Sequence, residues 1–150
     1  LFLMKLGKIE EAEEEKSLAT VAGFKQLGAE SRQKKNQEEQ SKRESEELER
    51  KKDMFLQVLE IDNDDIIANF GLGEYSYKVK DYERAIGYLE KTLTLDPKYS
   101  RAYLILGKSL IGANKKDQAI KIFNEGIEVA TTKGELMPAN EMQEQLSNLQ

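Results

Sequence analysis

The sequence contains neither cysteine nor histidine among its 150 residues. Without cysteine there are no disulfide bonds and no thiolate metal sites, and nothing indicates the redox compartment. Without histidine the chain lacks the commonest general base and the commonest zinc ligand. Carboxylate pairs such as Asp64 and Asp65 are adjacent in sequence and point in different directions. We therefore expect no enzymatic activity, no metal site and no cofactor.

Long apolar runs are also missing. Residues 104–106 form one of the longest aliphatic runs, far short of the ~20 residues that a membrane-spanning helix needs. We therefore expect no membrane insertion. No signal peptide pattern is visible, but this says little about location: the compartment stays unknown, with a soluble protein of the cytoplasm as the default expectation. The chain opens with LFLM and has no initiator methionine, so we expect it to be a fragment of a longer protein.

Neither sign of charge dominates the chain. Twenty-three basic and 28 acidic residues are interleaved and give a net charge of −5. Nucleic acids and anionic membranes select for basic patches, so neither is the expected partner. With 39% hydrophobic and 34% charged residues, the chain is more polar than a compact globule. Folds in which each part buries only its neighbours' faces have such a composition.

What the sequence does contain is a repeat. Residues 66–99 read IIANFGLGEYSYKVKDYERAIGYLEKTLTLDPKY, two helical patterns joined by a short polar break, and the following residues repeat the pattern. A fixed period of this size is typical of stacked repeat architectures. A shift of 34 positions superposes these pairs: Ala68 and Ala102, Leu72 and Leu106, Gly73 and Gly107, Ala85 and Ala119, Ile86 and Ile120, Leu89 and Phe123, Leu93 and Ile127, Leu95 and Val129.

Small residues at fixed positions predict close contacts between helices. Gly73 and Gly107 lie in the middle of predicted helices, where glycine costs about 1 kcal/mol relative to alanine. Such a cost is reasonable where a second helix crosses so closely that a side chain would clash. Ala85 and Ala119 are expected to be small for the same reason, and Pro97 marks the end of a helix. The alternative is a plain helical bundle with coincidental spacing.

These residues resemble the tetratricopeptide repeat, a unit of 34 residues. The resemblance rests on Leu72, Gly73, Ala85, Leu89, Asp96 and Pro97, and then on Leu106, Gly107, Ala119 and Phe123. Three positions depart from the family pattern: Asn69 replaces a bulky residue, Ser76 an aromatic one and Thr131 a proline. The resemblance implies an all-α, right-handed superhelical solenoid of antiparallel helix pairs, with an extended charged helical insertion and a C-terminal capping helix.

The first 65 residues follow this pattern less clearly. Residues 1–20 are expected to be a truncated N-terminal repeat with a turn at Gly7. Residues 21–65 are expected to be a degenerate repeat enlarged by a long charged insertion, whose two helices either project or merge into one. Within residues 29–50, Glu and Lys at i,i+4 spacing predict a helix solvated on all sides. A disordered charged linker is the alternative, and the lack of apolar heptads disfavours a coiled coil.

The second half of the chain is more regular. Residues 66–99 and 100–133 are expected to be complete tetratricopeptide repeats. The polar cluster 62–65 is expected to cap the helix that begins at Ile66. Residues 135–150 carry one apolar stripe and predict a terminal capping helix, which repeat arrays usually require for solubility.

In tetratricopeptide arrays, the first helix of each pair lines a concave groove that binds peptides or extended segments. The resemblance therefore implies a non-catalytic scaffold for a peptide or partner protein. Phe70 and Tyr77 are expected either to anchor that partner or to pack against a neighbouring helix. We expect Tyr77→Ala combined with Leu104→Glu to weaken partner capture without unfolding the chain. By position, the groove comprises Ile67, Phe70, Glu74, Tyr77, Lys78, Arg101, Leu104, Lys108 and Ile111.

The alternative function is structural. The chain would form homo-oligomers through the long charged helix or through a swapped terminal repeat. Phe2, Leu3 and Leu6 are apolar and need a partner if the first repeat is truncated. Light scattering at several concentrations distinguishes this alternative from a monomeric binding module.

Overall fold

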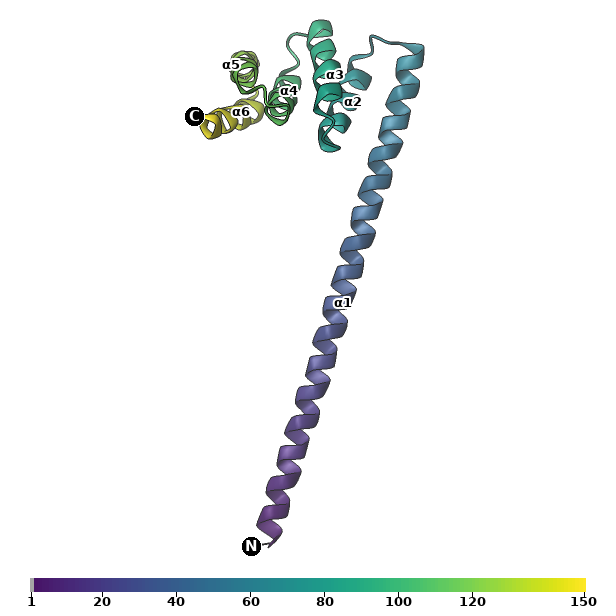
Figure 1. Cartoon of the computed structure of the whole chain (residues 1–150), viewed down its shortest axis with the longest axis vertical. Helices are drawn as coiled ribbons and strands as arrows, with labels where there is room; N and C mark the ends of the chain where they lie inside the picture. The colour runs from purple at the N-terminus through teal and green to yellow at the C-terminus, as the bar shows by residue number, and fades with distance from the viewer. Residues whose placement is uncertain (1) are drawn as a thin grey trace. The chain divides into compact units, whose positions relative to one another are not determined.

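The computed structural model describes the backbone of residues 2–150 and the side chains of residues 24–150. Within that backbone there are six helices and no strand, so the predicted all-α fold is confirmed (Figure 1). The chain divides into two compact units, residues 1–46 and residues 47–150. The helices are α1 (Phe2–Ile61), α2 (Ile66–Lys78), α3 (Tyr82–Leu95), α4 (Ser100–Gly112), α5 (Lys116–Lys133) and α6 (Leu136–Leu149).

The first unit consists of α1 up to residue 46. Its described side chains, from residue 24 onward, are almost all exposed, including the apolar Phe24 and Leu27. Lys42 and Glu46 form an i,i+4 ion pair at 4.0 Å, and both side chains are exposed. Such pairs each add only ~0.2–0.5 kcal/mol to a helix. Of the alternatives for residues 29–50, the structure contains the single helix.

The helix α1 is 60 residues long and passes through Gly7 and Gly28 without a break. The expected turn at Gly7 is therefore wrong. A glycine inside a helix costs only about 1 kcal/mol, and no proline stops this one. The side chains of Phe2, Leu3 and Leu6 lie outside the described part of the chain, and the swapped repeat that depends on them stays a prediction.

The second unit begins with the last turns of α1 and the short connection to α2. Asp65 caps α2 as predicted, because its Oδ1 accepts a hydrogen bond from the Ala68 amide at 2.7 Å. Asn69 is buried, and its Nδ2 donates to the carbonyl oxygens of Asn63 at 3.1 Å and Asp65 at 2.8 Å. Lys91 Nζ donates to the Asn63 carbonyl at 2.6 Å. Asn69 thus stabilises this connection, where the family pattern has a bulky residue.

The close approaches predicted from the glycines are present in both helix pairs. A Cβ atom at Gly73 would lie 2.7 Å from Leu89 Cγ, and one at Gly107 would lie 2.3 Å from Phe123 Cε1. Leu89 and Phe123 are both fully buried. Any larger residue at either glycine would overlap with the second helix of its pair. The two repeats therefore share one packing contact at equivalent positions.

The turns inside the two pairs are also equivalent. Lys80 and Asn114, which are 34 positions apart, both have positive φ values of 63° and 61°. Asp81 donates its amide to the Ser76 carbonyl at 2.8 Å, and Lys115 donates to Leu110 at the same distance. The same backbone turn thus reverses the chain in both repeats.

The helices α2–α6 form two stacked antiparallel pairs, α2 with α3 and α4 with α5, followed by α6 (Figure 1). We call α2, α4 and α6 the first-helix layer: α2 contacts α4, and α4 contacts α6. Within the described residues, α3 and α5 do not contact each other; each packs on α4. Leu72, Leu89, Leu106, Phe123 and Met142 fill the core between the helices, each with no more than 2% of its surface exposed.

The last helix, α6, packs one side on this core. Met142 is fully buried, and Leu146 and Leu149 pack against the same cluster, as the apolar stripe predicted. Glu141 and Glu144 are exposed. One apolar and one polar side suit the end of an array. In the described part of the chain, no helix combines the length and the apolar character needed to cross a membrane.

Candidate functional site

The structure separates the expected groove residues into accessible and buried ones. Ile67 is 68% exposed, although it is apolar. Phe70 and Leu104 are buried, with 9% and 4% of their surfaces exposed. The remaining six are exposed or half-buried: Glu74, Tyr77, Lys78, Arg101, Lys108 and Ile111. We call Ile67 together with these six the first-helix face.

Phe70 and Leu104 belong to the core. The Phe70 ring lies 4.8 Å from the Tyr99 ring, centroid to centroid, at a tilt of 44°. Tyr77 is half-buried, with its ring 6.1 Å from that of Tyr82. A glutamate at position 104 would place a charge in the core with no partner, which is strongly unfavourable. Leu104 is thus a core residue and not an accessible groove residue, and we expect Leu104→Glu to destabilise the fold, contrary to the expectation from the sequence.

One end of the first-helix layer carries a hydrogen-bonded cluster. Glu135 accepts hydrogen bonds from Lys133 Nζ at 2.9 Å and from the Ser100 hydroxyl. These donors hold the pKa of Glu135 below its ordinary value. Lys133 also donates to the Lys98 carbonyl at 2.8 Å. These bonds join the α3–α4 connection to the α5–α6 connection.

A second polar cluster joins the last turns of α1 to α2. Tyr75 Oη donates to Glu49 Oε1 at 2.6 Å, and Lys52 Nζ lies 2.6 Å from Glu49 Oε2. The Lys52 ammonium also lies 5.4 Å from the centroid of the Tyr75 ring. The bonds from Lys52 and Tyr75 lower the pKa of Glu49, and the bond to Glu49 raises the pKa of both donors. We call these three residues the Glu49 cluster.

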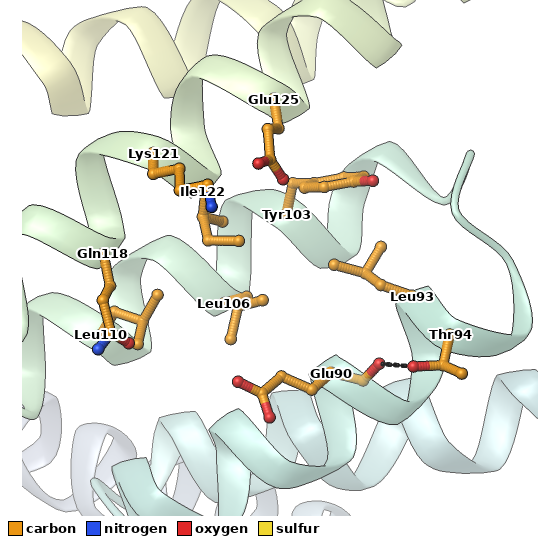
Figure 2. Close-up of a pocket in the computed structure, with 10 residues that line it drawn as sticks. All are labelled: Glu90, Leu93, Thr94, Tyr103, Leu106, Leu110, Gln118, Lys121, Ile122 and Glu125. Atoms are coloured by element: carbon orange, nitrogen blue, oxygen red, sulfur yellow. Dashed lines mark hydrogen bonds between the residues drawn. The ribbon is translucent and has the colours of Figure 1, made fainter.

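A hollow of about 570 Å³ lies between α3 and α5, over α4 (Figure 2). The two helices are not in contact, and the side chains of α4 form the floor between them. The sequence period predicted which helices touch, but it contained no signal for this gap. We call it the α3–α5 hollow, and its lining consists of Glu90, Leu93, Thr94, Tyr103, Leu106, Leu110, Gln118, Lys121, Ile122 and Glu125.

An equivalent hollow of about 610 Å³ occurs one repeat earlier, between the end of α1 and α3. Its residues Leu59, Asn69 and Tyr88 precede Leu93, Tyr103 and Ile122 by 34 positions. Further lining residues, Arg84 and Lys91, correspond in the same way to Gln118 and Glu125. We call this space the α1–α3 hollow. The two hollows therefore share a position in the repeat but differ in charge.

The hollow and the first-helix face lie on opposite sides of α4. At 3.6 residues per turn, Tyr103, Leu106 and Leu110 point to one side of this helix. The face residues Arg101 and Lys108 lie about half a turn away from them, and Ile111 about a third of a turn. Among residues with described side chains, no group of three or more acidic residues is arranged to hold a metal ion.

The sequence is similar to known proteins that contain helical repeats. Residues 76–133 match a family model described as tetratricopeptide repeat. A TPR repeat-containing protein of Pseudomonas aeruginosa is 33% identical over 79 residues, which span 53% of this chain and 75% of that protein. This chain belongs to the tetratricopeptide repeat family. The resemblance to this family is thus confirmed.

Solved structures share this arrangement of helices. The solution structure of a Bordetella parapertussis protein has a TM-score of 0.60 at 26% identity, covering 65% of this chain and 85% of that one. The crystal structure of a tetratricopeptide repeat domain from Salinibacter ruber has a TM-score of 0.53 at 28% identity, covering 57% and 94%. Tetratricopeptide repeats are protein-interaction modules and usually non-catalytic, so protein partners in general follow from membership.

Proposed function

We propose that this chain is a non-catalytic scaffold that binds a peptide or an extended segment of a partner protein on its first-helix face. The observation that carries the proposal is the continuous first-helix layer, in which α2 packs on α4 and α4 on α6. A layer of parallel helices of one kind offers an elongated surface, which suits an elongated ligand.

The chemistry of the first-helix face supports such a ligand. Ile67 is an exposed apolar side chain, and Tyr77 keeps part of its ring accessible. Glu74 and Lys78 form an ion pair at 3.3 Å, while Arg101 is exposed. Apolar and aromatic anchors contribute most of the binding energy of typical interfaces, and charges at the rim contribute specificity. The face therefore suits a segment that is partly apolar and of mixed charge.

A peptide array tests this proposal. The labelled chain is applied to synthetic peptides of known sequence that combine apolar and charged residues. The double variant Ile67→Ala with Tyr77→Ala is expected to bind its best peptides at least about tenfold more weakly, because two anchors are truncated. A second variant, Arg101→Glu, changes the charge of an exposed side chain and is expected to change which peptides bind.

The matched control carries Asn124→Ala and Thr131→Ala, two exposed positions on α5 that lie outside the first-helix layer. It is expected to bind like the wild type. Circular dichroism shows whether each variant keeps its helices. Unchanged peptide binding by a folded Ile67→Ala, Tyr77→Ala variant would refute the first-helix face as the binding site.

Self-assembly through α1 is the second candidate, and it stays a prediction. Phe24 and Leu27 favour it, because they are 71% and 62% exposed and residues 24–46 of α1 contain no other large apolar side chain. Their burial against a second copy would remove this apolar surface from water. Light scattering over a range of concentrations tests it: a mass that rises with concentration supports assembly, and a constant monomer mass contradicts it.

A further inference from the structure

We propose that the α3–α5 hollow is a second docking site, which takes a bulky apolar side chain flanked by lysine or arginine from a partner protein. This inference rests on the proposal that the chain binds proteins, but not on the first-helix face. The two sites lie on opposite sides of α4, so they can be tested separately.

The floor of the hollow and the lower part of its walls are apolar. Leu106 and Leu110 form the floor and are almost completely buried, while Leu93 and Ile122 are half-buried on the two walls. Figure 2 shows these side chains around the open space. A volume of about 570 Å³ is within the range of sites that hold small ligands. Filling it with an apolar side chain would remove Leu93 and Ile122 from water.

The floor is also held in place. Tyr103 Oη donates to the Pro97 carbonyl at 2.8 Å, so its polar end is satisfied while its ring lines the hollow. A Cβ atom at Gly126 would lie 2.5 Å from Tyr103 Cβ, so α5 approaches α4 closely there. A hollow with a fixed floor binds without reorganisation, which reduces the entropic cost of binding.

The charges around the hollow indicate the flanking residues of the partner. Glu90 lies on the α3 side and Glu125 on the α5 side (Figure 2). Both are exposed, and within the described side chains neither has an ion-pair partner within 4.0 Å. Lys121 is the one basic residue of the lining, which leaves an excess of one negative charge. A basic segment would neutralise this excess.

The equivalent hollow explains why one site is preferred. The α1–α3 hollow has the basic Arg84 and Lys91 where the α3–α5 hollow has Gln118 and Glu125. Lys91 is also engaged with Asn63 and lies 3.5 Å from Asp64. Arg84 likewise lies 3.5 Å from Asp81. The lining of the α1–α3 hollow therefore offers no carboxylate to a basic segment, whereas Glu90 and Glu125 attract one to the α3–α5 hollow. The difference in charge between the two repeats makes the interaction specific.

The test uses three synthetic peptides that share a central pair of leucines. Their flanks are lysine, glutamate or serine, and dissociation constants come from fluorescence anisotropy at low salt. The wild type is expected to bind the lysine-flanked peptide about tenfold more tightly than the glutamate-flanked one, because two carboxylates face the flanks. Glu90→Lys with Glu125→Lys is expected to reverse this order.

A matched control carries Glu141→Lys and Glu144→Lys on α6, two exposed positions that give the same change in net charge away from the hollow. It is expected to keep the preference for the lysine-flanked peptide. Amide chemical shifts are expected to change at Leu93, Leu106 and Ile122 when that peptide binds. Equal binding of the three peptides, or a preference that Glu90→Lys with Glu125→Lys leaves unchanged, would overturn the proposal.

The outcomes also separate this inference from the proposed function. The Ile67→Ala, Tyr77→Ala variant is expected to bind the lysine-flanked peptide as the wild type does. If that variant loses its array peptides and the hollow shows no charge preference, the inference fails and the first-helix proposal survives. If only the charge-reversal variant changes binding, the hollow survives and the first-helix proposal fails.

Discussion

The last turns of α1 and the helix α3 occupy equivalent positions in the repeat but differ in how they are packed. Phe55 and Leu59 of α1 lie 34 positions before Leu89 and Leu93 of α3. Both helices press an apolar side chain onto a glycine of α2: a Cβ atom at Gly71 would lie 2.2 Å from the Phe55 ring, and the same test at Gly73 meets Leu89. The apolar positions of the repeat are therefore present in α1.

The small residue of the repeat and its apolar neighbour are absent from α1. Where α3 has Ala85 and Ile86, which are buried, α1 has Lys51 and Lys52. The Lys51 side chain is 58% exposed, and Lys52 is engaged in the Glu49 cluster. A lysine cannot replace the small residue that lets a first helix pack closely. One small residue and one apolar neighbour therefore decide whether a second helix packs closely against the first helix of its own repeat.

The largest expected effect comes from exchanging the residues of this comparison. Ala85→Lys places a long cation at a fully buried position, so we expect a loss of about 3 kcal/mol or more in the free energy of unfolding. Lys51→Ala removes an exposed side chain and is expected to change it by no more than ~0.5 kcal/mol. Urea denaturation followed by tyrosine fluorescence measures both. Similar losses of stability in the two variants would refute the claim that the small residue is required in α3 but not at the equivalent position of α1.

Truncating the equivalent apolar side chains gives the next largest effect. Leu89 is fully buried, and Leu89→Ala is expected to cost ~2–5 kcal/mol through lost burial and the remaining cavity. Phe55 is half-buried, so Phe55→Ala is expected to cost less, about 1–2 kcal/mol. The same denaturation experiment applies. A larger cost for Phe55→Ala would show that the α1 contact matters more than the contact inside the pair.

Two glycines on facing helices are expected to respond with opposite signs. Gly73→Ala brings a methyl group within 2.7 Å of Leu89 Cγ and is expected to cost ~1–3 kcal/mol. Gly87 lies in α3 with no atom within 4 Å of its Cβ position, so Gly87→Ala is expected to stabilise by ~0.5–1 kcal/mol. Thermal unfolding of the two variants measures both changes. A stabilising effect of Gly73→Ala would contradict the close contact between Gly73 and Leu89.

The smallest effect concerns the Glu49 cluster, which holds α1 against α2. The bonds from Lys52 and Tyr75 lower the pKa of Glu49 below its ordinary value of 4.5. A carboxyl group with a lowered pKa stabilises the folded state above its ordinary value and loses that contribution as the pH falls through the lowered pKa. We expect the acid-range titration of the Tyr75 ring signals in NMR spectra to have its midpoint below pH 4.5.

Glu49→Gln is the matched variant for this titration. It is expected to abolish the shift of the Tyr75 ring signals and to leave those of Tyr88, which lies outside the cluster, unchanged. A Tyr75 titration that persists in Glu49→Gln would show that another group causes it.

The repeated part of the fold could be predicted because the same contacts recur. Gly73 with Leu89 and Gly107 with Phe123 are local pairs in which a small residue requires a large partner, so the period shows them. The single helix α1 was harder to predict from the sequence, because Gly7 resembles a turn signal. Only tertiary contacts distinguish a helix end from a glycine inside a helix. Asn69 departs from the family pattern, and its role depends on carbonyl groups that only the folded chain brings near.

The binding surfaces could be predicted only in part. Position in the repeat assigned Phe70 and Leu104 to the groove, but burial depends on which neighbours cover a residue, and Tyr99 covers Phe70. The α3–α5 hollow arises because α3 and α5 do not touch, and a sequence period contains no information about a missing contact. The negative charge of its lining indicates a preference for a basic partner only when it is compared with the basic lining of the α1–α3 hollow.

The central claim is that two helix pairs repeat one close contact, and NMR measures that contact directly. Nuclear Overhauser effects are expected between the Gly73 α-protons and the Leu89 methyl groups, and between the Gly107 α-protons and the Phe123 ring. Cross-peaks at both positions would support the repeated packing. A folded chain in which either glycine lacks its cross-peak would contradict it.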